Sequence, residues 1–278
     1  MLTNKFKINY SIGAVANGIK TDTFTFFLLF FYSNIIGLNP ALAGSAIFIA
    51  LCVDAVTDPL MGTISDRTNS SYGRRHPFMM ISFIPMSLGY IFLFAPRQDW
   101  DMSQSDLFIW MTIFTVITRI GMTLFDIPHR AFGGEVTKNY KERTILMSWR
   151  EMFGWVAGLS NAFLGYGVFF ASTSEYPQGQ LNPDAWFPFA VTGAIFMIVS
   201  VLYSSLSTKD EIKSLSKWSG SISLLDIVNE LKIAIGNKSF LIFFFGNLFL
   251  SLAWGLANTL TLFVNTYFWE FEATQIKY

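Results

Sequence analysis

The sequence has little charge for its length. Asp, Glu, Lys and Arg make up 14% of its 278 residues, whereas hydrophobic residues make up 52%. Soluble domains carry about 25% charged residues, so this composition excludes an ordinary soluble fold. We therefore expect a membrane protein in contact with the lipid bilayer.

Cysteine and the common cofactor motifs are also scarce. The one cysteine, Cys52, lies in an apolar run, which excludes a disulfide framework. There is no CxxC pair, HExxH, Walker A or GxGxxG motif. We expect no resident metal, no cofactor, no nucleic-acid partner and no enzymatic activity. The N-terminus lacks a small-residue cleavage site, so the first span itself is expected to direct insertion.

Long apolar runs are abundant. Several reach the roughly 20 residues that cross a bilayer core, and none shows the alternation of barrel strands, so helices are predicted. The predicted spans are residues 11–38, 41–63, 77–95, 107–132, 144–172, 186–206 and 239–268. Pro, Gly, Asn and Asp concentrate in the joints between them.

Lysine and arginine are unevenly distributed between the loops. One set of loops contains Lys5, Lys7, Arg67, Arg74, Arg75, Lys138, Lys141, Arg143, Lys209, Lys213, Lys217, Lys232 and Lys238. The opposite set contains only Arg97 and Lys277. The positive-inside rule places the first set and the N-terminus in the cytoplasm. We therefore expect a multi-pass protein of the cytoplasmic (inner) membrane.

The order of the spans predicts three regions. Residues 1–206 are expected to form a six-helix transmembrane domain, 207–238 a cytoplasmic linker, and 239–278 the first helix of an incomplete second domain. Six spans followed by a long loop are typical of the first half of a two-half transporter. The chain is thus interpreted as a truncated all-α membrane protein, monomeric when full length. Residues 223–236 are predicted to form an amphipathic helix that rests on the surface of the bundle or of the membrane. The alternative is that this helix binds a regulatory partner.

Charged side chains within the spans are the main functional signal, because each costs roughly 2.5–3.5 kcal/mol at a helix centre. Asp54 and Asp58 are four residues apart and share one helix face. Two such carboxylates repel, and a bound cation or proton relieves the repulsion, which predicts a coupling-ion site. Alternatively, they pair with basic residues of other spans and lock helices together. An acid dyad of a hydrolase is disfavoured, because both aspartates lie on one helix.

A second polar stripe and a loop accompany this pair. Arg119, Thr123, Asp126 and Arg130 recur at steps of four, three and four. The loop that follows Asp58 is a candidate gate, in which a glycine allows close helix approach and charged residues pair across helix ends. Its residues are Gly62, Asp66, Arg67, Gly73, Arg74 and Arg75. A purely topogenic role for the arginines is the alternative. The lone histidines, His76 and His129, are interpreted as structural.

Four stretches together resemble one family. They are DAVTDPLMGTISDRTNSSYGRRHPF, FLLFFYSNIIGL, LFDIPHRAF and ERTILMSWREMFGWVAG, at residues 54–78, 27–38, 124–132 and 142–158. The combination resembles the glycoside–pentoside–hexuronide:cation symporters, which include the melibiose carrier and belong to the major facilitator superfamily. The resemblance implies the N-terminal six-helix bundle of that fold, built from two three-helix inverted repeats, plus a seventh helix.

The resemblance also implies symport of a sugar or glycoside with H⁺ or Na⁺ by alternating access. It assigns cation binding to Asp54, Asp58, Thr57 and Thr123, and solute binding to Asp126 and Arg150. The nearby cations Lys20, Arg119 and Arg130 complete the candidate solute site, and together with Arg150 they are compatible with an anionic sugar such as a hexuronide. Two alternatives stay open: transport of a non-sugar solute, lipid-like or an organic anion, and a structural membrane protein whose charges only pair helices.

Overall fold

The computed structural model describes residues 2–68, 70–209, 233, 235–271 and 273–276, and no strand occurs among them. The first span is a chain of helical pieces: α1 (Asn4–Ile12), α2 (Ala14–Asp22), η1 (Thr23–Phe27), α3 (Leu28–Phe30) and η2 (Phe31–Ile36), of which η1 and η2 are π-helical. Then follow α4 (Pro40–Arg67), α5 (His76–Ile81), α6 (Phe83–Leu93), η3 (Gln98–Trp100), α7 (Gln104–Glu135), α8 (Tyr140–Leu164), η4 (Gly165–Phe169), η5 (Gly179–Leu181), η6 (Pro183–Ala185), α9 (Trp186–Ser207), α11 (Lys238–Phe263), η8 (Val264–Phe268) and α12 (Ala273–Ile276). The fold class is the all-α class that the sequence predicts.

Six helices among the described residues are long and apolar enough to cross a membrane. They are Pro40–Arg67, His76–Leu93, Gln104–Glu135, Tyr140–Phe169, Pro183–Ser207 and Lys238–Phe268. The first predicted span, 11–38, is helical from Ala14 to Ile36 but does not meet the same measure: its helix is divided into short pieces, and it carries Lys20 and Asp22. The predicted linker helix at 223–236 lies almost entirely outside the described residues.

Side-chain caps define where the long helices begin. Asn39 accepts a hydrogen bond from the Ala41 backbone N–H at 2.9 Å, and Pro40 follows at the first position of α4. Ser103 and Asp106 form a reciprocal capping box at the start of α7. These caps satisfy backbone N–H groups that have no partner within the helix, so the helix ends are set locally by sequence.

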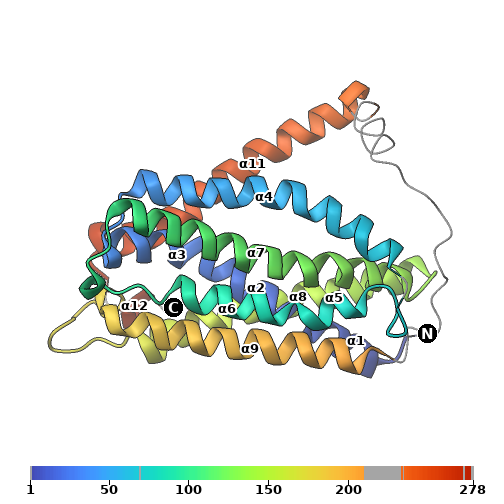
Figure 1. Cartoon of the computed structure of the whole chain (residues 1–278), viewed down its shortest axis with the longest axis horizontal. Helices are drawn as coiled ribbons and strands as arrows, with labels where there is room; N and C mark the ends of the chain where they lie inside the picture. The colour runs from blue at the N-terminus through green and yellow to red at the C-terminus, as the bar shows by residue number, and fades with distance from the viewer. Residues whose placement is uncertain (1, 69, 210–232, 234, 272, 277–278) are drawn as a thin grey trace.

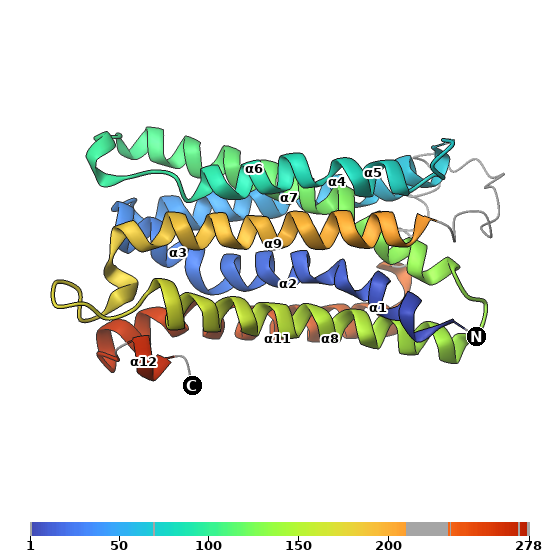
Figure 2. The ribbon, with the colours of Figure 1, turned by 90° about the horizontal axis from the view of Figure 1, so that it is seen from below.

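The packing of the spans is consistent with two related three-helix units (Figures 1 and 2). The first span packs against α8 and α9, and in the same way α7 packs against α4 and α6, while α6 also contacts α9. Exchanging the first three spans with the next three maps one set of contacts onto the other. Because each unit has an odd number of spans, consecutive units run in opposite directions, as the inverted-repeat prediction requires.

The first span lies at the centre of the bundle. Tyr10, Ala16, Phe30 and Tyr32 are all fully buried. At one end of the bundle Trp186 is enclosed by aromatic rings, and its indole N–H donates to the Gln180 carbonyl oxygen at 3.2 Å. Aromatic pairs of this kind contribute about 0.5–1.5 kcal/mol each beyond their buried area. This end of the bundle is therefore a rigid base for the polar residues of the first span.

The loops alternate between the two ends of the bundle. Figure 2 shows the N-terminus, the α4–α5 loop and the α7–α8 connection at one end, and α12 with the α6–α7 connection at the other. Among the described residues, the first end contains Arg67, Arg74, Arg75, Lys138, Lys141 and Arg143, and the second contains Arg97. The chain is thus a multi-pass bundle whose charge asymmetry follows its loops.

The backbones of the first span and α8 approach each other closely at one point. A Cβ placed on Gly18 would overlap the carbonyl oxygen of Gly154. A Cβ on Gly154 would instead meet the Ala14 carbonyl oxygen at 3.6 Å, an ordinary van der Waals separation. A close helix approach is also expected from the sequence at Gly62. A Cβ there would meet only the Ile127 side chain, at 3.8 Å, so the helices are not in close contact at this glycine. That part of the prediction was wrong: glycines mark close helix crossings at Gly18, against α8, and at Gly89 and Gly121, between α6 and α7.

This asymmetry gives a matched pair of variants. Gly18→Ala should lower the free energy of unfolding by about 1–3 kcal/mol, because the two helices must separate to admit the methyl group. Gly154→Ala should be neutral, or stabilising by up to about 1 kcal/mol through helix propensity. The unfolding midpoint of each purified variant in detergent measures the difference. Equal effects of the two changes would show that the crossing tolerates a side chain at Gly18.

Candidate functional site

Two side-chain contacts, called rungs below, connect α4 to α7: one between Asp54 and Arg119 and one between Asp58 and Thr123. Asp54 forms an ion pair with Arg119, and the Thr123 hydroxyl donates to Asp58 Oδ1 at 2.7 Å. Both rungs have the same register, because α4 and α7 run in the same direction and each pair is 65 residues apart. The i,i+4 spacing on one helix thus meets an i,i+4 spacing on the other. Asp54 is paired with a base, as the helix-pairing alternative expected, whereas Asp58 is held by a hydroxyl.

A small cavity of about 70 Å³ lies between these rungs and the first span. Its lining includes three aspartates and two basic residues, and consists of Asn17, Lys20, Asp54, Asp58, Arg119, Met122, Thr123, Asp126 and Ile127. Phe24 positions the two cations, with Lys20 Nζ 5.8 Å and the Arg119 guanidinium carbon 5.4 Å from its ring centroid. Positive and negative groups are therefore both present at the predicted ion site.

Oxygen atoms suited to a small cation are present at this cavity. Asp54 Oδ1 is buried and has no hydrogen-bond partner among the described residues, and the same holds for the hydroxyl of Thr57. Thr57 does not line the cavity, however. Carboxylate and hydroxyl oxygens are the ligands that hard cations prefer. Asp54, Asp58 and Thr123 thus fit a monovalent cation or a proton, whereas Thr57 precedes Asp58 in the chain but lies outside this lining.

A second cluster surrounds Asp126. Its carboxylate forms ion pairs with Arg150 and with Arg130, the latter at 2.7 Å. Both arginines also reach Glu151, at 2.7 Å from Arg150 and 3.4 Å from Arg130. The Arg150 side chain is 1% exposed, so its charge depends on these two carboxylates. The predicted solute-binding pair, Asp126 and Arg150, is thus brought together, but each residue is already satisfied by the other.

His129 fixes Arg150 from the opposite side. Its Nδ1 accepts from Arg150 Nε at 3.3 Å, and its ring stacks on Tyr10 at 4.1 Å between centroids. The Tyr10 hydroxyl donates to the His129 carbonyl oxygen at 3.0 Å. These contacts connect α1, α7 and α8. The structural interpretation of His129 is consistent with them.

At the basic end of the bundle, the loop between α4 and α5 forms a third cluster. Arg75 pairs with Asp66 at 2.6 Å and with Glu135 at 2.8 Å, and Arg74 pairs with Glu135 at 2.5 Å. Gly73 has a φ of +78°, a turn conformation that favours glycine. Arg67 is exposed and takes part in none of these pairs. The sequence did not point to Glu135, which is the acid that joins both arginines to α7.

A larger polar cavity of about 270 Å³ lies between the first span, α8 and α11. It is lined by Asn17, Gly18, Thr21, Asp22, Thr25, Phe26, Glu151, Gly154, Trp155, Gly158, Leu159, Trp254 and Asn258. None of the predicted solute-binding residues lines this larger cavity. Asn17 lines both this cavity and the small cavity between α4, α7 and the first span. The signal for it in the sequence is the i,i+4 recurrence of Asn17, Thr21 and Thr25 on one face of the first span.

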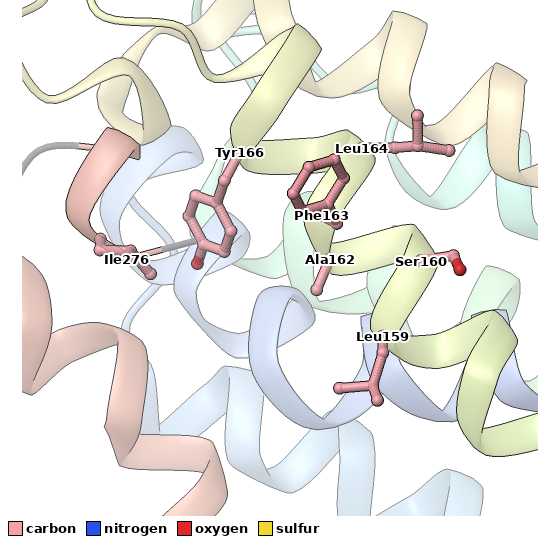
Figure 3. Close-up of a pocket in the computed structure, with 7 residues that line it drawn as sticks. All are labelled: Leu159, Ser160, Ala162, Phe163, Leu164, Tyr166 and Ile276. Carbon is pink, nitrogen blue, oxygen red and sulfur yellow. The ribbon is translucent and has the colours of Figure 1, made fainter. Parts of the chain in front are cut away.

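A third hollow, of about 710 Å³, is apolar and lies away from the charged clusters (Figure 3). It is lined by Leu159, Ser160, Ala162, Phe163, Leu164, Tyr166 and Ile276. Figure 3 shows Tyr166 beside Ile276, so the hollow lies where α8 and η4 approach α12. It has no charged lining residue among the described ones, and its size alone does not make it the ion or sugar site.

Comparison with known proteins places this arrangement in context. A profile of the family described as MFS/sugar transport protein matches residues 9–278. An uncharacterized symporter of Synechocystis is 32% identical over 210 residues, which cover 74% of this chain and 38% of the relative. A putative glycoside/cation symporter of Escherichia coli is 27% identical over 237 residues, 85% of this chain and 49% of the relative. A sodium-dependent lysophosphatidylcholine symporter of Danio rerio is 30% identical over 163 residues, 56% of this chain and 30% of the relative. The chain spans about half the length, or less, of these relatives.

The Asp54–Arg119 pair can be tested by a double-mutant cycle. Arg119→Gln or Asp54→Asn alone should lower the free energy of unfolding by about 3–5 kcal/mol, because each leaves an unpaired charge in the bundle. The double variant should recover at least half of the loss. Unfolding midpoints in detergent measure the cycle, and Arg67→Gln, at an exposed arginine, is the control, expected within about 0.5 kcal/mol of the parent. Additive losses would show that the pair does not act as a unit.

Proposed function

The chain belongs to the MFS/sugar transport protein family, and from this premise we propose that it forms the N-terminal half of a cation-coupled symporter. In this proposal a sugar or glycoside moves with H⁺ or Na⁺ by alternating access, and the chain is not an enzyme. The names of these relatives support symport. The observation that carries the proposal is the position of the small ion cavity directly beside the larger polar one, with Asn17 in both linings.

The proposed ion site is centred on Asp58. Its carboxylate has a hydroxyl partner and, among the described residues, no ion pair, whereas Asp54 shares its charge with Arg119. An entering cation or proton would neutralise Asp58 and use Asp54 Oδ1 and the Thr123 hydroxyl as further oxygen ligands.

Coupling follows from the shared wall between the cavities. Asp126 lines the ion cavity and, through Arg150, is connected to Glu151, which lines the larger cavity. A change of charge at Asp58 therefore acts on residues that face the solute. Ion and solute then strengthen each other's binding by the same factor. Rocking of this bundle against a second six-helix half would expose both cavities to either side.

The membrane placement extends the same proposal. The basic end of the bundle faces the cytoplasm, by the positive-inside rule, and the protein resides in the cytoplasmic membrane as a monomeric transporter. The ion-paired cluster of Asp66, Arg74, Arg75 and Glu135 then lies at the cytoplasmic face. There it would hold the α4–α5 loop against α7 during the rocking motion.

A lipid-like solute is the second candidate. The apolar hollow between α8, η4 and α12 would accept an acyl chain, and one relative is named as a lysophosphatidylcholine symporter. Leu159 lines both this hollow and the polar cavity. A solute with a polar head and an apolar tail would therefore fit across the two.

Uptake into membrane vesicles tests the proposal, with the chain expressed in its complete reading frame. We expect a labelled glycoside to accumulate under an H⁺ or a Na⁺ gradient. Asp58→Asn should reduce this accumulation about 10-fold or more, because the coupling free energy is lost, while solute exchange without a gradient persists. Asp54→Asn should also reduce it. Lysophosphatidylcholine is included beside neutral glycosides and uronides.

Asp99→Asn, the same change at an exposed position in the short helix η3, is the control and should leave accumulation unchanged. Accumulation of the lipid alone would favour the second candidate. A structural role for the charges would be supported if neither gradient changed accumulation in the parent and Asp58→Asn affected only folding.

A further inference from the structure

The polar cavity between the first span, α8 and α11 has an unbalanced charge. Its described lining includes two acids, Asp22 and Glu151, and no Lys, Arg or His. Three of the cations that favoured an anionic sugar in the sequence are committed elsewhere: Arg119 to Asp54, and Arg130 and Arg150 to Asp126 and Glu151. The remaining cation, Lys20, lines the small ion cavity instead.

Asp22 is the acid without a basic partner. Glu151 is neutralised by two arginines, but Asp22 forms no ion pair among the described residues. The residue is 9% exposed, and its Oδ2 accepts from Asn161 Nδ2 at 2.9 Å. Among the described residues, the side-chain hydrogen bond to this carboxylate thus comes from one amide, that of Asn161.

A hydrogen-bonded network fixes the direction of this carboxylate. Asn161 also donates to the Thr23 hydroxyl at 3.2 Å, and that hydroxyl is 2.7 Å from the Tyr90 hydroxyl. Asn161, Thr23 and Tyr90 are all buried, and they come from three different spans. Asp22 is therefore a preorganised acceptor at the cavity wall rather than a mobile side chain.

We infer that this cavity selects neutral or cationic hydroxylated solutes over anionic ones, with Asp22 accepting hydrogen bonds from the solute's hydroxyl or ammonium groups. The inference rests on the proposed function and specifies its solute class. Trp155 and Trp254 also line the cavity, and aromatic side chains of this kind pack against the apolar face of a sugar ring or against a cation. A uronate carboxylate would instead meet the Asp22 charge in a site that supplies no compensating base.

The test compares three glycosides that differ in one substituent: a neutral glucoside, the corresponding glucuronide and the corresponding amino sugar glycoside. Competition uptake and direct binding to the purified full-length protein are both measured at pH 7. We expect the neutral or the amino compound to be preferred over the glucuronide by about 100-fold, since like charges and unpaired partners are the usual means of rejection.

Asp22→Asn keeps an acceptor oxygen but removes the charge, so the preference should fall by about 10-fold or more. Asn258→Asp places a further acid on the same lining with little change of shape, and should raise the preference. It also provides a reading if Asp22→Asn does not fold. Asp99→Asn, at an exposed position in the short helix η3, is the matched control and should leave the ratio unchanged.

A parent that binds the glucuronide as well as the glucoside overturns the inference, as does a ratio unaffected by both cavity variants. Absence of saturable binding for all three compounds also overturns it. Gradient-driven uptake with the wrong preference would refute only this solute class. Binding with the expected preference but without any gradient dependence would refute the symport proposal and leave the inference standing.

Discussion

Charge that is buried in a lipid-facing bundle must be compensated inside it, and the rest of this structure follows from that constraint. A single carboxylate or guanidinium at the centre of a span is costly, yet the described spans bring several together. Asp54 meets Arg119, and Asp126 meets two arginines. Helix order, helix rotation and the small first-span glycine at the α8 crossing all serve to bring these partners within reach. The same compensation makes the site responsive, because any ion that enters must redistribute it.

Much of this could be predicted from local sequence. The spacing of Asp54 and Asp58 places them on one face of α4, and the matching spacing of Arg119 and Thr123 does the same on α7. Apolar run length gave the long spans, because lipid permits few alternatives to a helix. The first span was harder to recognise as a single helix by length and hydropathy, since it is central, polar on one side and divided by π-helical turns.

Pairing between spans could not be predicted in the same way. Which base neutralises which acid depends on the rotation and height of separate helices, and no local pattern encodes either. The sequence therefore does not reveal that Glu135 pairs with the arginines of the α4–α5 loop or that Glu151 pairs with Arg150. The polar cavity was missed for the same reason, because its lining combines the first span with Trp155 of α8 and Trp254 of α11. Gly62 shows the opposite error, in which a glycine suggested a crossing that the structure has elsewhere.

The π-helical turn at Thr23–Phe27 has a geometric consequence for the first span. A π turn holds an additional residue, so it shifts the angular phase of everything that follows it along the helix axis. Before the turn, Asn17 and Thr21 face the polar cavity; beyond it, Phe30 and Phe31 face the aromatic end of the bundle. The first span can thus direct its polar residues to the polar cavity and its aromatic residues to the aromatic end of the bundle. In a regular α-helix of the same sequence, the residues after the turn would point in other directions. The phase shift, rather than any single side chain, determines where the polar half of the span ends.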